Sequence, residues 1–344
     1  MQLSVGVLGA SGFAGSEFLR IAAAHPLLDV VWASGETQAG VPISELYPAL
    51  APVYPDDRFV SYDPALLDGL DAVVLGMPHG ASQPLVPELV ASGVAIVDLA
   101  ADFRLQDPAD YDTWYGAAHT SPDLLPTFVY GLPELYRDRI TGATRVAAPG
   151  CYPTAVLLAL APLVRAGLIE PSGLIVDAAS GVSGAGRPPK PNTTFCTVDE
   201  DFTAYGLLDH RHTAEMQEHL GATVLFTPHL APMNRGILAT CYARPTAAAV
   251  SAGMSTDSLL GELSAAYDGE PFVVVSERSP STKATQGSNC AHLSARFDHR
   301  TGTVIVLSAI DNLVKGTAGQ AVQCLNLMFG LPEATGLPRV GFAP

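Results

Sequence analysis

Short runs of Val, Ile and Leu alternate with helix-length segments through the first 150 residues. This alternation is typical of a parallel sheet that helices cover on both faces. Residues 15–24 are predicted to form a helix that ends before His25-Pro26, because proline disfavours helical geometry in the residue preceding it. The strands of this part are predicted at residues 4–8, 29–33, 72–75, 95–98 and 145–147.

The pattern changes after residue 151. Residues 154–166 predict a strongly apolar, buried helix, with Pro153 suited to its first turn and Gly167 to its end. Strands then dominate, which indicates a mixed or antiparallel sheet. A final helix is predicted over 312–329, and its place after the last strand suggests that the chain returns to the first domain. The strands of this part are predicted at residues 174–177, 221–227, 236–243, 272–276, 291–298 and 303–310.

Composition narrows the class of protein. A chain of 344 residues with 48% apolar content can form two domains with packed cores. No run of about 18 apolar residues predicts a membrane span, and no leader pattern follows Met1, so we expect a cytoplasmic protein. The formal charge of −16 argues against a nucleic-acid partner, while a few arginines and helix N-termini can still bind a small anion. The five cysteines lack a CxxC pair and are expected to be reduced.

A glycine-rich loop follows the first predicted strand and opens the first helix. Its G-x-x-G-x-x-G spacing suits a dinucleotide, since glycines let the backbone approach a pyrophosphate and the helix N-terminus favours negative charge. The alternative is a tight turn that simply needs glycine. The residues predicted to bind the cofactor here are Gly9, Ser11, Gly12, Phe13, Ala14 and Gly15.

The residues at the end of the second strand should determine whether NAD or NADP is bound. An acidic residue there binds the ribose 2′-hydroxyl and repels a 2′-phosphate. Ser34 is suited to hydrogen-bond a phosphate, whereas Glu36 lies nearby and residues 32–40 contain no arginine. We expect NADP, with NAD left open. His79 follows the third strand at the same sheet edge and is predicted to contact the cofactor.

Cys151 lies just before the predicted apolar helix. The positive end of the helix dipole favours a thiolate there, as a nucleophile requires. The alternative of a buried structural cysteine suits Cys241 and Cys324 better. A proton-handling partner is expected at His210 or His212, at the start of another helix. A zinc site is not expected, because two histidines two residues apart without a cysteine pair make a poor signature.

Seven blocks of the chain resemble the N-acetyl-gamma-glutamyl-phosphate reductases of arginine biosynthesis, type 1, within the semialdehyde dehydrogenase superfamily. Their order along nearly the whole chain makes the resemblance specific. The blocks are Gly9-Ala10-Ser11-Gly12-Phe13-Ala14-Gly15, Met77-Pro78-His79-Gly80, Ala101-Asp102-Phe103-Arg104, Tyr130-Gly131-Leu132-Pro133-Glu134, Pro149-Gly150-Cys151-Tyr152-Pro153-Thr154, His210-Arg211-His212-Thr213 and Val314-Lys315-Gly316-Thr317-Ala318-Gly319-Gln320.

The resemblance implies a Rossmann-type domain over 1–150 plus 312–344, and an α+β catalytic and oligomerisation domain over 151–311 like that of glyceraldehyde-3-phosphate dehydrogenase. It implies that Cys151 attacks an acyl phosphate and that NADPH reduces the resulting thioester to an aldehyde. His212 is implied as the acid/base residue, with His210 in reserve. Gly319 is expected at the cofactor, and a homo-oligomer, specifically a tetramer, is implied.

Three arginines are candidate anion-binding residues, since the guanidinium fork matches phosphate or carboxylate geometry. Surface ion pairs are the alternative for Arg104, Arg187 and Arg235. A sister reductase acting on an aminoadipyl or glutamyl phosphate held by an acidic carrier protein remains open. So does a non-catalytic NADP-sensing protein, although Cys151 and His212 argue against it, while a cysteine hydrolase would leave the glycine loop unexplained.

Overall fold

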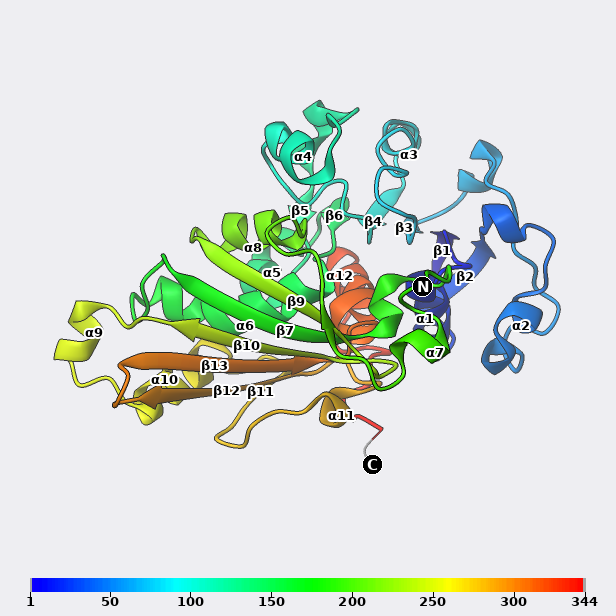
Figure 1. The fold of residues 1–344 in the computed structure, drawn as a ribbon. Helices are drawn as coiled ribbons and strands as arrows, with labels where there is room; N and C mark the ends of the chain where they lie inside the picture. The colour runs from blue at the N-terminus through cyan, green and yellow to red at the C-terminus, as the bar shows by residue number, and fades with distance from the viewer. Residues whose placement is uncertain (1, 343–344) are drawn as a thin grey trace. The chain divides into compact units, whose positions relative to one another are not determined.

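The N-terminal strands form a six-stranded parallel sheet in the order β2-β1-β3-β4-β6-β5 (Figure 1). The computed structural model describes residues 2–342. The five strands predicted for this part are present within one residue of their predicted bounds, and β5 was not predicted. The strands are β1 (Leu3–Leu8), β2 (Leu28–Ala33), β3 (Ala72–Leu75), β4 (Ala95–Asp98), β5 (Val129–Tyr130) and β6 (Arg145–Ala147).

Helices cover this sheet, whose strands β1, β3 and β4 are almost entirely buried, as a parallel sheet requires. The C-terminal helix α12 packs on β4, α1 and α5, and Thr317–Leu337 belong to this unit. The helices are α1 (Phe13–Ala22), α2 (Ile43–Leu46), α3 (Val86–Ser92), α4 (Pro108–Tyr115), α5 (Pro133–Ile140) and α12 (Gly319–Met328).

A second, seven-stranded sheet has the order β11-β12-β13-β10-β7-β9-β8 and mixes parallel with antiparallel pairs (Figure 1). All six strands predicted for this part are present, which confirms the α/β plus α+β fold class. The strands are β7 (Leu174–Gly181), β8 (Thr203–Ala204), β9 (Val224–Ala231), β10 (Ile237–Ala243), β11 (Val273–Val275), β12 (Ala291–Asp298) and β13 (Thr303–Ile310).

One face of the second sheet is covered by helices. The apolar helix α6 packs on β10 and β13, α10 packs on β12 and α8 packs on β9. Burial alternates along the strands, so that Leu174 and Val176 are buried while Ile175 between them is 40% exposed. The helices of this unit are α6 (Cys151–Arg165), α7 (Phe195–Val198), α8 (His212–Leu220), α9 (Ala247–Ser251), α10 (Thr256–Ala266) and α11 (Thr282–Thr285).

The chain forms two compact units. One contains the residues up to Pro149 together with Thr317–Leu337, and the other contains Gly150–Gly316 with the residues from Pro338 onward. The domain bounds predicted from the sequence, and the roles given to the domains, stay predictions. No helix among residues 2–342 is long and apolar enough to cross a membrane. No cluster of His, Cys, Asp and Glu able to hold a metal ion occurs among the same residues.

Candidate functional site

The turn between β1 and α1 depends on glycine for its geometry. Gly9 has a φ of 73°, and a Cβ at this position would lie 2.6 Å from the carbonyl oxygen of Gly76. The loops after β1 and β3 therefore approach each other at backbone distance. In the sheet, β1 lies between β2 and β3. The chain passes from β1 to β2 on one side, and the later strands from β3 onward lie on the other side of β1. Doubly wound sheets bind ligands at such switch points, beyond the carboxyl ends of the strands.

The first turn of α1 is suited to an anion. Gly12 is the N-cap residue and contributes no side chain, and no acidic residue lies in the first turn. Amides at a helix start point toward a ligand, and the helix dipole favours its negative charge. Ser11 helps to hold the turn, because its carbonyl oxygen accepts a 2.7 Å hydrogen bond from the Tyr47 hydroxyl.

Ser34 and Glu36, after β2, meet different surroundings. Ser34 is 1% exposed, and its hydroxyl accepts a 3.3 Å hydrogen bond from the Gly9 amide, so its side chain supports the glycine turn. Glu36 is exposed, and its carboxylate accepts a hydrogen bond from the Tyr62 amide. The sequence analysis missed Arg58, whose guanidinium donates to the Gly40 carbonyl and so brings a positive charge to the loop after β2.

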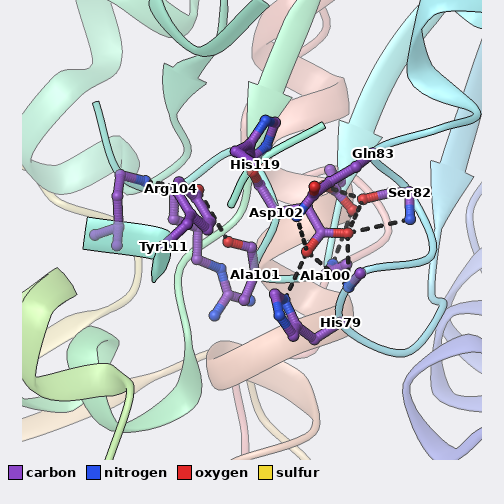
Figure 2. A network of polar contacts seen from close by, with 12 residues as sticks. His79, Ser82, Gln83, Ala100, Ala101, Asp102, Arg104, Tyr111 and His119 are labelled. Carbon is purple, nitrogen blue, oxygen red and sulfur yellow. Dashed lines mark hydrogen bonds and ion pairs between the residues drawn. The ribbon is translucent and has the colours of Figure 1, made fainter. Parts of the chain in front are cut away.

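His79 lies in the loop after β3, beside Asp102 (Figure 2). Its Nδ1 is 2.6 Å from the Asp102 carboxylate, and its ring packs at 4.2 Å from the ring of Tyr115. Arg104 is buried close to this network. Its guanidinium donates to the carbonyls of Leu99 and Ala148, each at 2.8 Å.

Cys151 is the first residue of α6, with Gly150 as the N-cap. Thr154 binds the Gly150 carbonyl through both its amide and its hydroxyl, each at 2.9 Å, which closes the first turn. The thiol therefore lies at the positive end of a 15-residue helix, where negative charge on sulfur is stabilised. On another side, a Cβ on Gly316 would lie 2.8 Å from the Cys151 Cβ, so this glycine leaves room for the cysteine.

His212 lies directly against the start of this helix. A Cβ on Gly150 would be 2.5 Å from the His212 Nε2, so only glycine before Cys151 admits the imidazole. The buried Glu215, one turn further along α8, accepts a 2.8 Å hydrogen bond from the Gly150 amide. Residues three apart on a helix share a face, so one face of α8 presents both His212 and Glu215. The sequence analysis missed Glu215, although its spacing from His212 was a usable signal.

His210 lies beside His212 but is enclosed by aromatic rings. Its ring meets those of Tyr152, Tyr205 and Phe226 at centroid distances of 5.7, 5.6 and 5.3 Å. Its Nδ1 accepts a hydrogen bond from the His212 amide at 3.2 Å. Burial, aided by the charge of Arg211, lowers the pKa of His210 to about 4. The imidazole of His210 is therefore neutral at pH 7.

The remaining predicted site residues are spread over both units. Arg235 lies 3.6 Å from the buried Asp311, and Arg187 follows the short turn Val182–Ala185. Gly319 is the buried first residue of α12. The structure thus brings Cys151, His212 and His210 together in one unit, and Gly9 and Ser34 together in the other.

This arrangement provides a partly exposed nucleophile at a helix N-terminus with an imidazole beside it. Such a pair can form a covalent bond to an electrophilic carbon and handle the proton of the oxygen on that carbon. The glycine turn of the other unit can bind a pyrophosphate. The two sets of residues together are those expected of a dehydrogenase with a covalent intermediate.

Comparison with known proteins gives a match for each of the two parts of the chain. Residues 4–143 match the NAD-binding domain of semialdehyde dehydrogenases, and residues 151–312 match the semialdehyde dehydrogenase dimerisation domain. Aspartate semialdehyde dehydrogenase II of Vibrio cholerae has the same fold, with a TM-score of 0.70 and 17% identity over 96% of this chain and 99% of that one. The Candida albicans aspartate semialdehyde dehydrogenase also has a TM-score of 0.70, at 14% identity and the same coverage.

Relatives of higher identity identify the family. The N-acetyl-gamma-glutamyl-phosphate reductase of Symbiobacterium thermophilum is 47% identical over 99% of both chains. The reductase of Geobacter sulfurreducens is 46% identical over the full length of both. These similarities confirm the resemblance carried by the seven sequence blocks. The chain belongs to the N-acetyl-gamma-glutamyl-phosphate reductase family of semialdehyde dehydrogenase oxidoreductases, and its N-terminal part is a nicotinamide-dinucleotide-binding domain.

Proposed function

We propose that this enzyme reduces N-acetyl-gamma-glutamyl phosphate to N-acetylglutamate 5-semialdehyde and phosphate in arginine biosynthesis, with NADPH as reductant and a thioester on Cys151. The observation that carries the proposal is the placement of Cys151 at the start of α6 with the His212 imidazole against Gly150. Relatives that are 44–47% identical over the full length support the choice of acyl group.

In the first half of the reaction, the Cys151 sulfur attacks the acyl carbon. A carbon–sulfur bond forms, the bond from that carbon to the phosphate oxygen breaks, and phosphate leaves with the bonding electrons. The N-terminus of α6 stabilises the attacking thiolate. The product is a thioester, which accepts a hydride more readily than a carboxylate does.

In the second half, NADPH held by the glycine turn would supply a hydride to the thioester carbon. His212 gives a proton to the oxygen that becomes negative in this step, and so stabilises the thiohemiacetal. The carbon–sulfur bond then breaks, the hydroxyl proton returns to His212, and Cys151 leaves as the thiolate. The aldehyde is released and the enzyme regains its starting state.

The surroundings of the two histidines support His212 as the acid/base residue. A proton donor at neutral pH needs a pKa near the working pH. His210 is neutral at pH 7 because burial holds its pKa near 4, and its Nδ1 is bound to the His212 amide. We therefore assign His210 the role of holding the start of α8 in place.

For the substrate anions, Arg187 and Arg235 lie in the same unit as Cys151, which supports them as phosphate and carboxylate ligands. Asp311 lies beside Arg235 and restricts its side chain. Arg104 has less support, because its guanidinium already donates to two backbone carbonyls.

The glycine turn fits a dinucleotide. A Cβ at Gly9 would meet the Gly76 carbonyl, and the first turn of α1 has no acidic side chain. We assign Gly9, Ser11 and Gly12 with Phe13, Ala14 and Gly15 to the pyrophosphate, and His79 and Gly319 to other parts of the cofactor. The preference for NADP rests on Arg58, whose charge lies at the loop after β2, since the Ser34 hydroxyl is buried beside the glycine turn. Glu36, already hydrogen-bonded to the Tyr62 amide, opposes it.

We also propose a homo-oligomer, a tetramer, built through the second sheet. The face of this sheet opposite α6 carries apolar side chains at paired positions, with Ile175 40% and Leu225 49% exposed. Apolar side chains exposed side by side are typical of protein–protein interfaces. Residues 151–312 match a dimerisation domain, which supports this placement.

The test is the reverse reaction, followed as NADPH formation at 340 nm from N-acetylglutamate semialdehyde, phosphate and NADP. Turnover should require phosphate, exceed turnover with NAD, and fall more than about 100-fold in Cys151→Ser, since covalent catalysis is then lost. Cys196→Ser, at an exposed cysteine, is the matched control and should keep wild-type activity.

Each component of the proposal has its own contradicting result. Turnover only with a carrier-bound semialdehyde would exclude the free substrate. A preference for NAD would exclude the NADP assignment. Full activity of Cys151→Ser would exclude the thioester, and binding of NADPH without turnover of any semialdehyde would indicate a sensor.

A further inference from the structure

Two buried aspartates surround one serine hydroxyl in the nucleotide-binding unit. Asp98 ends β4 and Asp102 follows it by four residues, and neither side chain is exposed. The Ser82 hydroxyl oxygen is 2.7 Å from the Asp102 carboxylate and 3.1 Å from that of Asp98. Figure 2 shows the Ser82 and Asp102 side of this arrangement.

The geometry requires a proton on one of the two carboxyls. A serine hydroxyl has a single hydrogen, so it can donate to only one of them. The shorter contact assigns that hydrogen to Asp102. The Ser82 oxygen also lies 3.1 Å from the Asp98 carboxyl, and with its one hydrogen directed to Asp102 it would accept a hydrogen bond from a protonated Asp98. A continuous series of hydrogen bonds results, in which the Asp98 carboxylic acid donates to Ser82 and Ser82 donates to the Asp102 carboxylate.

The electrostatics agree with this assignment. Burial and the neighbouring charge of Asp102 raise the pKa of Asp98 to about 8, against opposing effects of the Ala100 amide, Arg104 and Ser82. The other elements packed on β4 add little charge. Helix α12 and strand β3 contain no charged residue, and Arg145 of β6 is paired with Ile96, away from Asp98.

Asp102, by contrast, is held in the ionised state. Burial alone would raise its pKa, but hydrogen bonds from His79, Ser82 and the Gly80 amide lower it below the usual range. Two further contacts hold the loop after β3, since the amides of Gly80 and Ser82 donate to the same carboxylate at 2.8 and 3.1 Å. Asp102 thus fixes both the backbone and the histidine of this loop.

His79 is the outward-facing end of this series of hydrogen bonds. Its Nδ1 meets Asp102 at 2.6 Å and its side chain is 22% exposed, which leaves Nε2 as the ring nitrogen able to contact a ligand. The loop after β3 also carries Gly76, whose carbonyl lies against the glycine turn. A carboxylate on one imidazole nitrogen fixes the orientation of the ring and the chemistry of the other nitrogen.

We propose that Asp98, Ser82 and Asp102 are positioning residues that hold the His79 imidazole for contact through Nε2 with the bound dinucleotide, and that binding depends on the proton carried by Asp98. The inference rests on the proposed dinucleotide cofactor and adds a set of residues to its site. Loss of the Asp98 proton places two carboxylates on one hydroxyl. Their repulsion breaks this series of hydrogen bonds and releases the loop that carries His79.

The experiment measures the Kd for NADPH by its fluorescence from pH 6 to 9.5. In the wild type, Kd should rise about fivefold or more as pH passes about 8, a loss of about 1 kcal/mol by the standard conversion. In Asp98→Asn this rise should disappear, because the amide donates to Ser82 as the protonated acid does but cannot titrate. A general structural defect would not remove a pH dependence selectively.

Two further variants test the other links. Ser82→Ala should weaken NADPH binding about tenfold at every pH, because the hydrogen bonds through the Ser82 hydroxyl are then absent at every pH. Ser92→Ala is the matched control, since its hydroxyl only binds the Leu89 carbonyl within α3, and it should behave as the wild type. His79→Ala should weaken binding and remove the dependence on pH together.

Three results would overturn the inference. They are an unchanged alkaline rise in Asp98→Asn, a wild-type Kd in Ser82→Ala, or a wild-type profile in His79→Ala. Failure of the wild type to bind NADPH at any pH would instead contradict the proposed cofactor.

Discussion

At the scale of single residues, neighbouring histidines have different chemistry because their surroundings differ. His210 lies among the rings of Tyr152, Tyr205 and Phe226, which shield it partly from water and favour the neutral imidazole. His212 starts α8 and lies against Gly150, next to Cys151. Their position two residues apart in the sequence could not separate them, because the aromatic enclosure is assembled from distant segments.

This difference predicts separate effects on the pH profile. His212→Asn should lower kcat about 100-fold or more, the usual size of an acid/base contribution, and remove an ionisation between pH 5 and 9. His210→Asn should retain that ionisation, because a group with a pKa of about 4 is already neutral over this range. The measurement is kcat against pH with saturating substrate. Loss of the ionisation in His210→Asn and not in His212→Asn would reverse the assignment.

Some site residues could be predicted locally and others could not. The place of Cys151 at a helix start was predictable because an apolar helix follows it directly and a helix N-terminus is a local property, while its role as nucleophile stays a prediction. Glu215 was only partly predictable, because its spacing from His212 places both on one helix face but its contact with the Gly150 amide, 65 residues earlier in the chain, exists only in the folded structure. Ser34 was expected to face a phosphate, and the structure shows its hydroxyl supporting the Gly9 amide.

At the scale of elements, hydrophobic patterns predicted the long strands well and the ends of the helices less well. The strand β5 was missed because it has two residues, too few for a pattern. Helix α6 was predicted to start at residue 154 but starts at Cys151, because proline is tolerated anywhere in the first turn, where its missing N–H has no partner within the helix. The helix predicted over 312–329 contains a π-helical turn, Val314–Ala318, before α12.

Helix α10 offers a prediction about stability. Gly261 lies inside it with nothing within 4 Å of an added Cβ, so Gly261→Ala should raise the free energy of unfolding by about 0.5–1 kcal/mol. Ser255 caps the same helix through the Ser258 amide, and Ser255→Ala should lower that free energy by about 1 kcal/mol. Urea denaturation at constant protein concentration measures both. A decrease for Gly261→Ala would contradict this account of α10.

At the scale of the whole molecule, the exposed face of the second sheet is the feature that the packing of this chain alone leaves unexplained. Helices α6, α8 and α10 cover one face, while Ile175 and Leu225 pair on the other. An apolar pair on exposed strands is costly in water unless another surface covers it.

The proposed oligomer follows from this face and can be tested there. Leu225→Glu should shift the protein to a smaller species in light scattering after gel filtration, because a carboxylate would be buried at the interface. Val31→Glu is the control, since Val31 is also 49% exposed but lies on β2 of the other unit. It should leave the mass unchanged. An unchanged mass for Leu225→Glu would place the interface elsewhere.

The sequence by itself determined the fold class, the order of most elements, the glycine turn and the place of Cys151 at a helix start. These features depend on periodicity and on short motifs, in which the interacting residues are neighbours in the chain. Only the tertiary structure decided which groups surround them. The neutral His210, Glu215 on the Gly150 amide and the two aspartates around Ser82 each join segments from different elements. Their protonation states follow from burial and from neighbouring charges, which exist only once the chain is folded.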